Sequence, residues 1–269
     1  SSAASDVYKR QIQGREVDFR VSIMPSIHGE DAVLRILDKS QRGESLSLEN
    51  LGLATDTIAR IRVFASEPYG MLLVTGPTGS GKSTTLYAAL SETNTGEKKI
   101  ITIEDPVEYE LPGVLQIPVN DKKGLTFARG LRSILRHDPD TILVGEIRDG
   151  ETAGIAVQAA LTGHLVLSSV HANSAFSVLE RFTYMDVDPA SFVEALNGVV
   201  AQRLVRRICP DCGVDATPDP DIAHLAQLPE TQLKQGHYRI GKGCEACRHT
   251  GYRGRLALAE VLTLTDSIK

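Results

Sequence analysis

The sequence predicts an α/β fold in which a parallel sheet carries a nucleotide phosphate site. Two observations lead to this class. A complete phosphate-loop motif lies between a short apolar run and a helical one, and two further apolar runs end in acidic residues. The composition agrees, since 269 residues with 42% hydrophobic and 23% charged side chains are ordinary for a globular protein that buries a core.

The charge and the hydrophobic pattern narrow the expected partners. A formal net charge of −5 gives no overall basic field that would favour nucleic acid or an anionic membrane, so we expect no nucleic-acid partner. No apolar run approaches the roughly 18 to 20 residues of a membrane span, and no signal-peptide pattern is visible. These features predict a cytoplasmic protein.

The N-terminal part of the sequence predicts a small domain of its own. Residues 1–11 are polar and unpatterned, and we leave them as an unassigned tail. Apolar and polar residues alternate over 17–23, which indicates a half-buried strand, and residues 32–37 predict a second strand that pairs with it antiparallel. The polar segment 41–45 predicts a hinge. We therefore expect residues 12–45 to form the end of a small α/β domain and residues 46–269 the main domain.

Two arginines of this hairpin need an explanation. Arg20 falls on the polar face of the first strand, and Arg35 interrupts the otherwise apolar second strand. Because burying an unpaired arginine is costly, each side chain needs an anionic partner. One interpretation is a local salt bridge with Asp18, Glu30 or Asp31. The other is that both arginines reach a phosphate group of a bound ligand.

The phosphate loop is the most specific signal in the sequence. It fits G-x-x-x-x-G-K-[ST] in full, follows an apolar strand over 71–75 and precedes a helix over 83–90, which makes a chance match in a glycine-rich turn the weaker interpretation. The glycines let backbone N–H groups surround an anion at the positive end of the helix. Lys82 is predicted to contact the β- and γ-phosphates, and Ser83 to bind Mg²⁺. The predicted nucleotide-binding residues are Gly76, Pro77, Thr78, Gly79, Ser80, Gly81, Lys82, Ser83 and Thr84.

Acidic residues end the next two predicted strands. The strand over 99–104 ends in Glu104 and Asp105, and the strand over 141–146 ends in Glu146. In open parallel sheets ligands bind beyond the carboxyl ends of the strands, so these carboxylates can converge on the γ-phosphate. We predict that Glu104 positions or deprotonates the attacking water and that Glu146 holds Mg²⁺ directly or through water. For a single acid, a helix cap or a solvated loop is the alternative.

Two histidines bracket another predicted strand. His164 precedes and His171 follows the run 165–170, which should lie beside the phosphate loop. A lone histidine is usually structural, but a pair in this position predicts contacts with the γ-phosphate.

The four cysteines form two C-x-x-C pairs in the last quarter of the sequence. Four thiolates with no obvious nucleophile partner are typical of a closed structural zinc site, here within an irregular excursion over 208–248. A redox dithiol and unligated cysteines are the alternatives. The predicted zinc ligands are Cys209, Cys212, Cys244 and Cys247.

Together these motifs resemble the secretion and type IV pilus assembly ATPases, the GspE/PilB group of RecA-like hexameric motors. The likeness runs from about residue 12 to 269 and rests on the phosphate loop, residues 102–109 as the Asp box, 143–149 as an atypical Walker B motif and 161–175 as the His box. The resemblance implies a RecA-like P-loop ATPase domain preceded by a small α/β (PAS-like) segment. It also implies a hexamer that acts at the inner membrane on a platform protein.

The resemblance assigns roles to residues already singled out. Arg20 and Arg35 match arginines that approach ATP at a subunit boundary, and the tetracysteine element is typical of secretion and pilus-extension members. Because the family usually has a longer N-terminal region and a further C-terminal helical segment, it also predicts that this sequence is a fragment with a foreign N-terminal end. The implied site residues are Lys82, Ser83 and Thr84 on phosphate and Mg²⁺, Glu104 as the catalytic carboxylate, Glu146 at the metal, and His164 and His171 near the γ-phosphate.

The predicted function is Mg²⁺-dependent ATP hydrolysis that powers assembly of a pseudopilus for type II secretion or extension of a type IV pilus. Two alternatives remain. A RecA-like DNA-translocating or conjugation-type ATPase is disfavoured by the net charge, and a nucleotide-dependent scaffold with little hydrolysis is disfavoured by the complete set of acidic strand ends.

Overall fold

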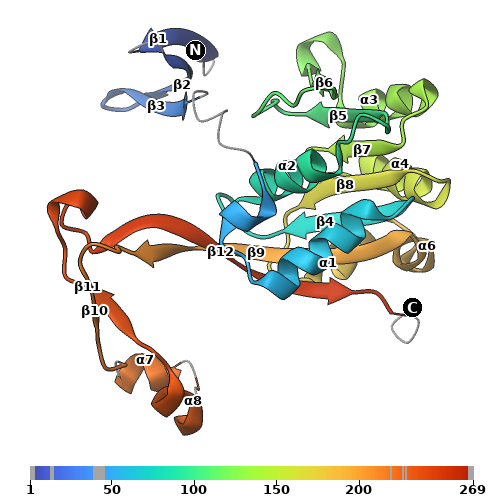
Figure 1. The fold of residues 1–269 in the computed structure, drawn as a ribbon. Helices are drawn as coiled ribbons and strands as arrows, with labels where there is room; N and C mark the ends of the chain where they lie inside the picture. The colour runs from blue at the N-terminus through green and yellow to red at the C-terminus, as the bar shows by residue number, and fades with distance from the viewer. Residues whose placement is uncertain are drawn as a thin grey trace.

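The computed structural model describes residues 4–12, 15–38, 46–218, 220–225, 227 and 229–265. Its main feature is a seven-stranded sheet with the strand order β12-β9-β4-β8-β7-β5-β6 (Figure 1). The six strands β9, β4, β8, β7, β5 and β6 run parallel to one another, and β12 pairs antiparallel with β9 at one edge. The strands are β4 (Gly70–Thr75), β5 (Ile100–Glu104), β6 (Leu115–Pro118), β7 (Thr141–Val144), β8 (Leu165–Val170), β9 (Leu196–Ile208) and β12 (Tyr252–Thr263).

The central strands are buried along their whole length, because helices cover both faces of the sheet. Strands β4, β5, β7 and β8 contain only buried residues, which explains why their sequences are mostly apolar without a polar-apolar alternation. Successive side chains of β4 enter different cores. Met71 and Leu73 belong to one hydrophobic cluster, and Leu72 and Val74 to the other.

Two groups of helices supply the other halves of these cores. Helices α1 (Thr55–Ser66) and α2 (Lys82–Thr93) pack on the face of Leu72, and the 3₁₀ turn Leu48–Leu51 joins them there. The face of Met71 is covered by four helices, whose buried side chains include Phe127 and Leu131 at helical spacing. These helices are α3 (Phe127–Ile134), α4 (Gly150–Leu161), α5 (Ser177–Tyr184) and α6 (Pro189–Ala195). The predicted α/β class is confirmed.

A separate three-stranded antiparallel sheet forms the N-terminal part, in the order β1-β2-β3. The hairpin of β2 (Arg15–Ser26) and β3 (Gly29–Asp38) confirms the two predicted strands. The segment that was left unassigned contains strand β1 (Ala4–Ile12), whose backbone pairs along β2 from Ala4 to Ile12. Its sequence carries no clear alternation, so the partner strand determines its conformation. The predicted hinge at 41–45 lies outside the described residues.

The excursion between β9 and β12 contains a short antiparallel pair and two short helices, and Figure 1 shows it extending away from the main sheet. Strands β9 and β12 continue beyond the sheet as a two-stranded arm that leads to it. Its elements are β10 (Gly213–Asp215), α7 (Pro220–Leu225), α8 (Glu230–Gln235), β11 (Arg239–Gly241) and the 3₁₀ turn Glu245–Cys247.

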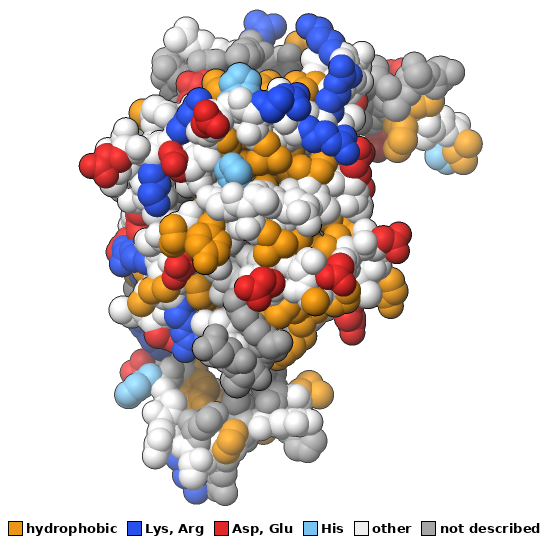
Figure 2. Space-filling view, turned by 90° about the vertical axis from the view of Figure 1, so that its right-hand side faces the viewer, with side chains coloured by type: hydrophobic (Ala, Val, Ile, Leu, Met, Phe, Trp, Pro, Cys, Tyr) orange, Lys and Arg blue, Asp and Glu red, His pale blue; other side chains and the backbone are white. Residues whose placement is uncertain are grey.

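The surface of the described residues is mixed in character. Figure 2 shows Lys and Arg side chains gathered at the upper end of one face, with hydrophobic, acidic and basic side chains interspersed over the rest of it. Within the described part of the chain, the helices all fall short of the length and hydrophobicity that crossing a membrane requires.

Candidate nucleotide site and cysteine centre

The carboxyl ends of β4, β5, β7 and β8 meet at one edge of the sheet, because these strands run parallel. A cavity of about 800 Å³ opens there. Residues 78–84 of the phosphate loop line it, together with both predicted acidic strand ends, His171 and Arg35. The structure therefore brings most of the predicted site residues around one space.

The phosphate loop needs glycine at its first position for two reasons. Gly76 has φ +139°, a backbone conformation that side chains disfavour, and a Cβ there would stand 2.2 Å from the carbonyl oxygen of Gln202. Gln202 of β9 also holds the far side of the loop, since its Nε2 donates to the Ser80 carbonyl oxygen at 2.7 Å. Its Oε1 accepts a hydrogen bond from the hydroxyl of Thr85, also at 2.7 Å. Gln202 thus ties the phosphate loop and the start of α2 to β9.

The side chain of Lys82 is positioned to bind an anion. Its Nζ donates to the carbonyl oxygens of Gly76 at 2.9 Å and Pro77 at 3.1 Å, and only 9% of the residue is exposed. Burial lowers the pKa of Lys82, while the charge of Glu146 opposes that shift. The buried Ser80 Oγ has no hydrogen-bond partner among the described residues. A loop with a desolvated cation and an unpaired hydroxyl fits a bound phosphate.

Glu104 is held rigidly by three side-chain donors. The residue is 4% exposed, and its carboxylate accepts hydrogen bonds from the Tyr87 and Thr102 hydroxyls and from Gln116 Nε2 at 3.3 Å. Burial, followed by the hydrogen bond to Glu104, raises the pKa of Tyr87, so this phenol stays a donor. A carboxylate has about four acceptor positions, which leaves one for a water molecule.

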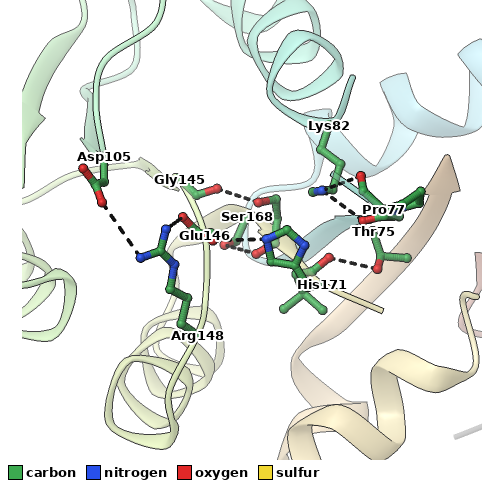
Figure 3. A network of polar contacts seen from close by, with 12 residues as sticks. Thr75, Pro77, Lys82, Asp105, Gly145, Glu146, Arg148, Ser168 and His171 are labelled. Atoms are coloured by element: carbon green, nitrogen blue, oxygen red, sulfur yellow. Dashed lines mark hydrogen bonds and ion pairs between the residues drawn. The ribbon is translucent and has the colours of Figure 1, made fainter. Parts of the chain in front are cut away.

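Glu146 lies between two basic side chains (Figure 3). Arg148 donates to one of its oxygens, and His171 Nε2 is 3.3 Å from the other. Arg148 also lies 3.9 Å from Asp105, so it links the two acidic strand ends. The hydrogen bond to Glu146 raises the pKa of Arg148. Thr75 anchors the segment before His171, because its hydroxyl donates to the Val170 carbonyl oxygen at 2.9 Å.

The structure brings His171 but not His164 to this cavity, so the predicted γ-phosphate contact has a place there only for His171. β8 separates them by six residues, or about 20 Å of extended backbone. His171 follows the carboxyl end of β8 and lines the cavity, whereas His164 precedes its amino end. There the His164 Nδ1 lies 3.0 Å from the carbonyl oxygen of Ala159, at the end of α4.

Arg20 and Arg35 occupy directly paired positions in β2 and β3. Opposed residues of an antiparallel pair share one face, so this face carries two like charges side by side. Arg35 lines the cavity and makes no ion pair with any side chain that the structure describes. The side chain of Arg20 lies outside the described ones. Glu30 and Asp31 do not pair with Arg35, whereas the side chain of Asp18, the third partner considered, lies outside the described ones. The position of Arg35 at the cavity favours the phosphate interpretation, and both interpretations remain predictions.

The four cysteines form a second centre, at the ends of β9 and β12. All four Sγ atoms lie within 4.8 Å of one another, and the shortest separations are 3.7 to 3.9 Å. A tetrahedral zinc site with bonds of about 2.3 Å places its sulfurs about 3.8 Å apart. The backbone N–H groups of Cys244 and Gly251 point at the Cys247 sulfur at 3.2 and 3.3 Å, which stabilises a thiolate. The cluster fits a structural zinc ion, and the four cysteines form no disulfide with one another.

We expect the purified chain to contain about one zinc ion, and the substitution Cys212→Ser to reduce that content severalfold, because a closed site needs all four thiolates. Elemental analysis by mass spectrometry measures the ratio. His249→Ala is the matched control, because His249 lies close in sequence to Cys247 and is not part of the cluster. A wild-type chain without zinc whose thiols are reduced would contradict the expectation.

This fold and this cavity define the chain as a RecA-like P-loop domain. A family profile described as "Type II/IV secretion system protein" matches residues 7–269, and the chain belongs to that family. The match begins five residues earlier than predicted, inside the strand that was expected to be a foreign tail.

Named relatives agree with this assignment. The chain is 52% identical over 261 residues to the Type II secretion system protein E of Dickeya dadantii, covering 96% of this chain and 51% of that protein. It is 48% identical over 254 residues to the Type IV pilus assembly ATPase PilB of Thermus thermophilus, covering 94% of this chain and 28% of that protein. The chain thus spans about half, or less, of these relatives.

Solved structures show the same architecture. The pilus retraction motor PilT with bound ADP superposes with a TM-score of 0.62 at 32% identity, over 86% of this chain and 68% of that one. The ATPase DotB of Legionella pneumophila has a TM-score of 0.68 at 23% identity, over 99% of this chain and 64% of that one, which shows a shared fold.

Several residues of the site were not predicted. Arg148 follows Glu146 by two positions, and its place in that motif was a usable signal. Tyr87, Gln116 and Gln202 reach the site from a helix and two strands, and their sequence positions carried no signal. Arg255 lines the cavity from β12.

Proposed function

We propose that the chain is the motor part of a protein that hydrolyses ATP with Mg²⁺ to drive assembly of a pseudopilus or type IV pilus. The observation that carries the proposal is the convergence of the phosphate loop, Glu104, Glu146 and His171 on one cavity. The names of the relatives supply the biological setting, secretion and pilus assembly. We place the reaction on the cytoplasmic side of the membrane, where ATP is supplied.

Each side chain has a defined task in this proposal. Lys82 leaves its two loop carbonyls and pairs with the β- and γ-phosphates, while Glu104 orients a water molecule for in-line attack and accepts its proton. Ser83 and Glu146 would hold Mg²⁺, which supplies charge neutralisation at the phosphates when bound. His171 and Arg148 orient the Glu146 carboxylate, and His171 is close enough to the cavity to contact the γ-phosphate.

We further propose that the N-terminal sheet completes the site. Arg35 and Arg20 would bring positive charge to the phosphates from this chain or from a neighbouring subunit of a ring, which we propose to be a hexamer. Closing of this sheet on ATP and its release after hydrolysis would then move a platform protein at the inner membrane.

The test of this proposal is the ATP turnover per molecule over a range of protein concentrations. We expect the specific rate to rise with concentration and Arg35→Ala to lower it about tenfold, because Arg35 shares the phosphate charge with Lys82 and the metal. Arg60→Ala is the control, since that exposed side chain pairs with Asp56 on α1.

A mixture of two weakly active variants distinguishes whether Arg35 acts on the nucleotide of its own chain or on that of a neighbouring subunit. If Arg35 acts on the neighbouring subunit, a mixture of Lys82→Ala and Arg35→Ala chains regains turnover, because some interfaces then contain both intact residues. A mixture as inactive as its components, or a specific rate that does not depend on concentration, would show that one chain completes its own site.

A further inference from the structure

We propose that the four-cysteine cluster positions Arg255 against the base of the bound nucleotide. The proposal rests on the nucleotide binding proposed above and extends it to the end of the cavity that no catalytic group occupies. Three observations carry it: the residues that line the two ends of the cavity, the lack of an acidic partner for Arg255 among the described residues, and the hydrogen bonds between the cluster and the start of β12.

The cavity has two chemically different ends. In the strand order β12-β9-β4-β8-β7-β5, the phosphate loop follows β4, the acidic strand ends lie on the β7 and β5 side, and β9 and β12 lie on the other side. Leu204 and Arg255 line the cavity from those two strands. A nucleotide whose terminal phosphate faces Glu104 and Glu146 therefore extends its base toward Leu204 and Arg255.

Arg255 is suited to a planar aromatic ligand. A guanidinium group stacks on the face of an aromatic ring, and Leu204 offers an apolar surface beside it. Arg255 and Arg206 are directly opposed in β12 and β9, and the Arg206 guanidinium already lies 4.0 Å from the centroid of the Tyr252 ring. Among the described residues, no acidic side chain pairs with Arg255. Of the two opposed arginines, Arg255 is the one left for a ligand.

The cysteine cluster fixes the place where β12 begins. The N–H of Gly251 donates to the Cys247 sulfur at 3.3 Å, and the N–H of Cys209 donates to the Gly251 carbonyl oxygen at 2.9 Å. Tyr252 then pairs with Ile208, and the register shifts before Arg255. A metal held by the four thiolates would therefore hold the last turn of backbone before Arg255, and so set the direction of its side chain.

The first experiment compares the dissociation constants of ADP and of inorganic pyrophosphate. We expect Arg255→Ala to raise the Kd of ADP about tenfold and to leave that of pyrophosphate unchanged, because pyrophosphate has no base to stack. Arg203→Ala is the control: Arg203 is an exposed arginine of the same strand as Leu204, on the opposite face. An equal rise for both ligands would assign Arg255 to the phosphates, and no rise for ADP would remove it from the site. Either result overturns the proposal.

The second experiment removes the metal with a chelator. Chelation should raise the Kd of ADP in the wild-type chain toward that of Arg255→Ala, and should have no further effect in that variant, because both changes remove one interaction. Additive effects, no effect on the wild type, or loss of pyrophosphate binding would overturn the positioning role, the last because the cluster would then support the fold as a whole. A wild-type chain that binds neither ADP nor pyrophosphate would instead contradict the proposed function.

Discussion

Replacing Glu104 by glutamine is expected to lower ATP turnover by about 10² to 10⁴, while ADP binds with nearly unchanged affinity. The amide keeps the size of the side chain but no longer accepts a proton from the attacking water. Its effect on binding is small because Glu104 sits at the end of β5, buried among Tyr87, Thr102 and Gln116, rather than in the phosphate loop. Steady-state phosphate release and ADP titration measure the two quantities separately.

Tyr87→Phe provides the matched comparison for this prediction. It removes one of the donors that orient Glu104 but leaves the carboxylate itself, so its turnover should fall far less than that of Glu104→Gln. If Glu104→Gln turned over ATP at the parental rate, Glu104 would not be the general base. If the parent chain bound ATP but hydrolysed it no faster than the variant, the protein would be a nucleotide-dependent scaffold.

Replacing Lys82 by alanine is expected to raise the dissociation constants of both ADP and pyrophosphate by about 10² or more. Hydrogen bonds to charged groups contribute roughly 1.5 to 3 kcal/mol each, and the ammonium is placed to make two of them to phosphate oxygens. The variant also leaves the loop carbonyls of Gly76 and Pro77 without their donor. Calorimetric titration with both ligands measures the change.

Lys122→Ala is the control for Lys82, because Lys122 lies on the 3₁₀ turn Asp121–Lys123 and does not line the cavity. Since Lys82→Ala removes a phosphate contact, it should weaken pyrophosphate as strongly as ADP, unlike Arg255→Ala. An unchanged affinity for pyrophosphate in Lys82→Ala would mean that the ligand binds outside the phosphate loop.

The parts of the fold that were predictable from the sequence are those in which a local pattern and the final burial agree. β4, β5, β7 and β8 are short apolar runs, and all their residues are buried. The phosphate loop is equally local, because its backbone conformation depends on glycines close in sequence. The class of fold and the edge of the sheet that carries the site followed from these runs.

β9 was not predicted, because its sequence combines two environments. Its first half is mostly buried between β4 and β12, whereas its second half, which contains Arg203, Arg206 and Arg207, is exposed in the arm. No single period describes such a strand. The contacts of Gln202 could not be predicted from the sequence either, since its partners Thr85 and Ser80 lie 117 and 122 positions away.

His164 and His171 show a different limit of prediction from the sequence. The sequence indicated a strand between His164 and His171, and the strand is present as β8. A six-residue strand is about 20 Å long, so the two histidines lie at opposite ends of β8 and cannot both reach one phosphate within this chain. The motif resemblance gave both residues one role, and the strand geometry separates them.

The excursion between β9 and β12 begins and ends at the same point of the molecule. The cysteine cluster closes its base, and the pairing of Gly213–Asp215 with Arg239–Gly241 closes it a second time. Since the free-energy cost of a closed loop grows only slowly with its length, the segment between Asp215 and Arg239 is able to lengthen, shorten or change sequence while the main sheet stays as it is. Related chains can therefore differ in the length and sequence of this excursion without any change in the sheet that carries the nucleotide site.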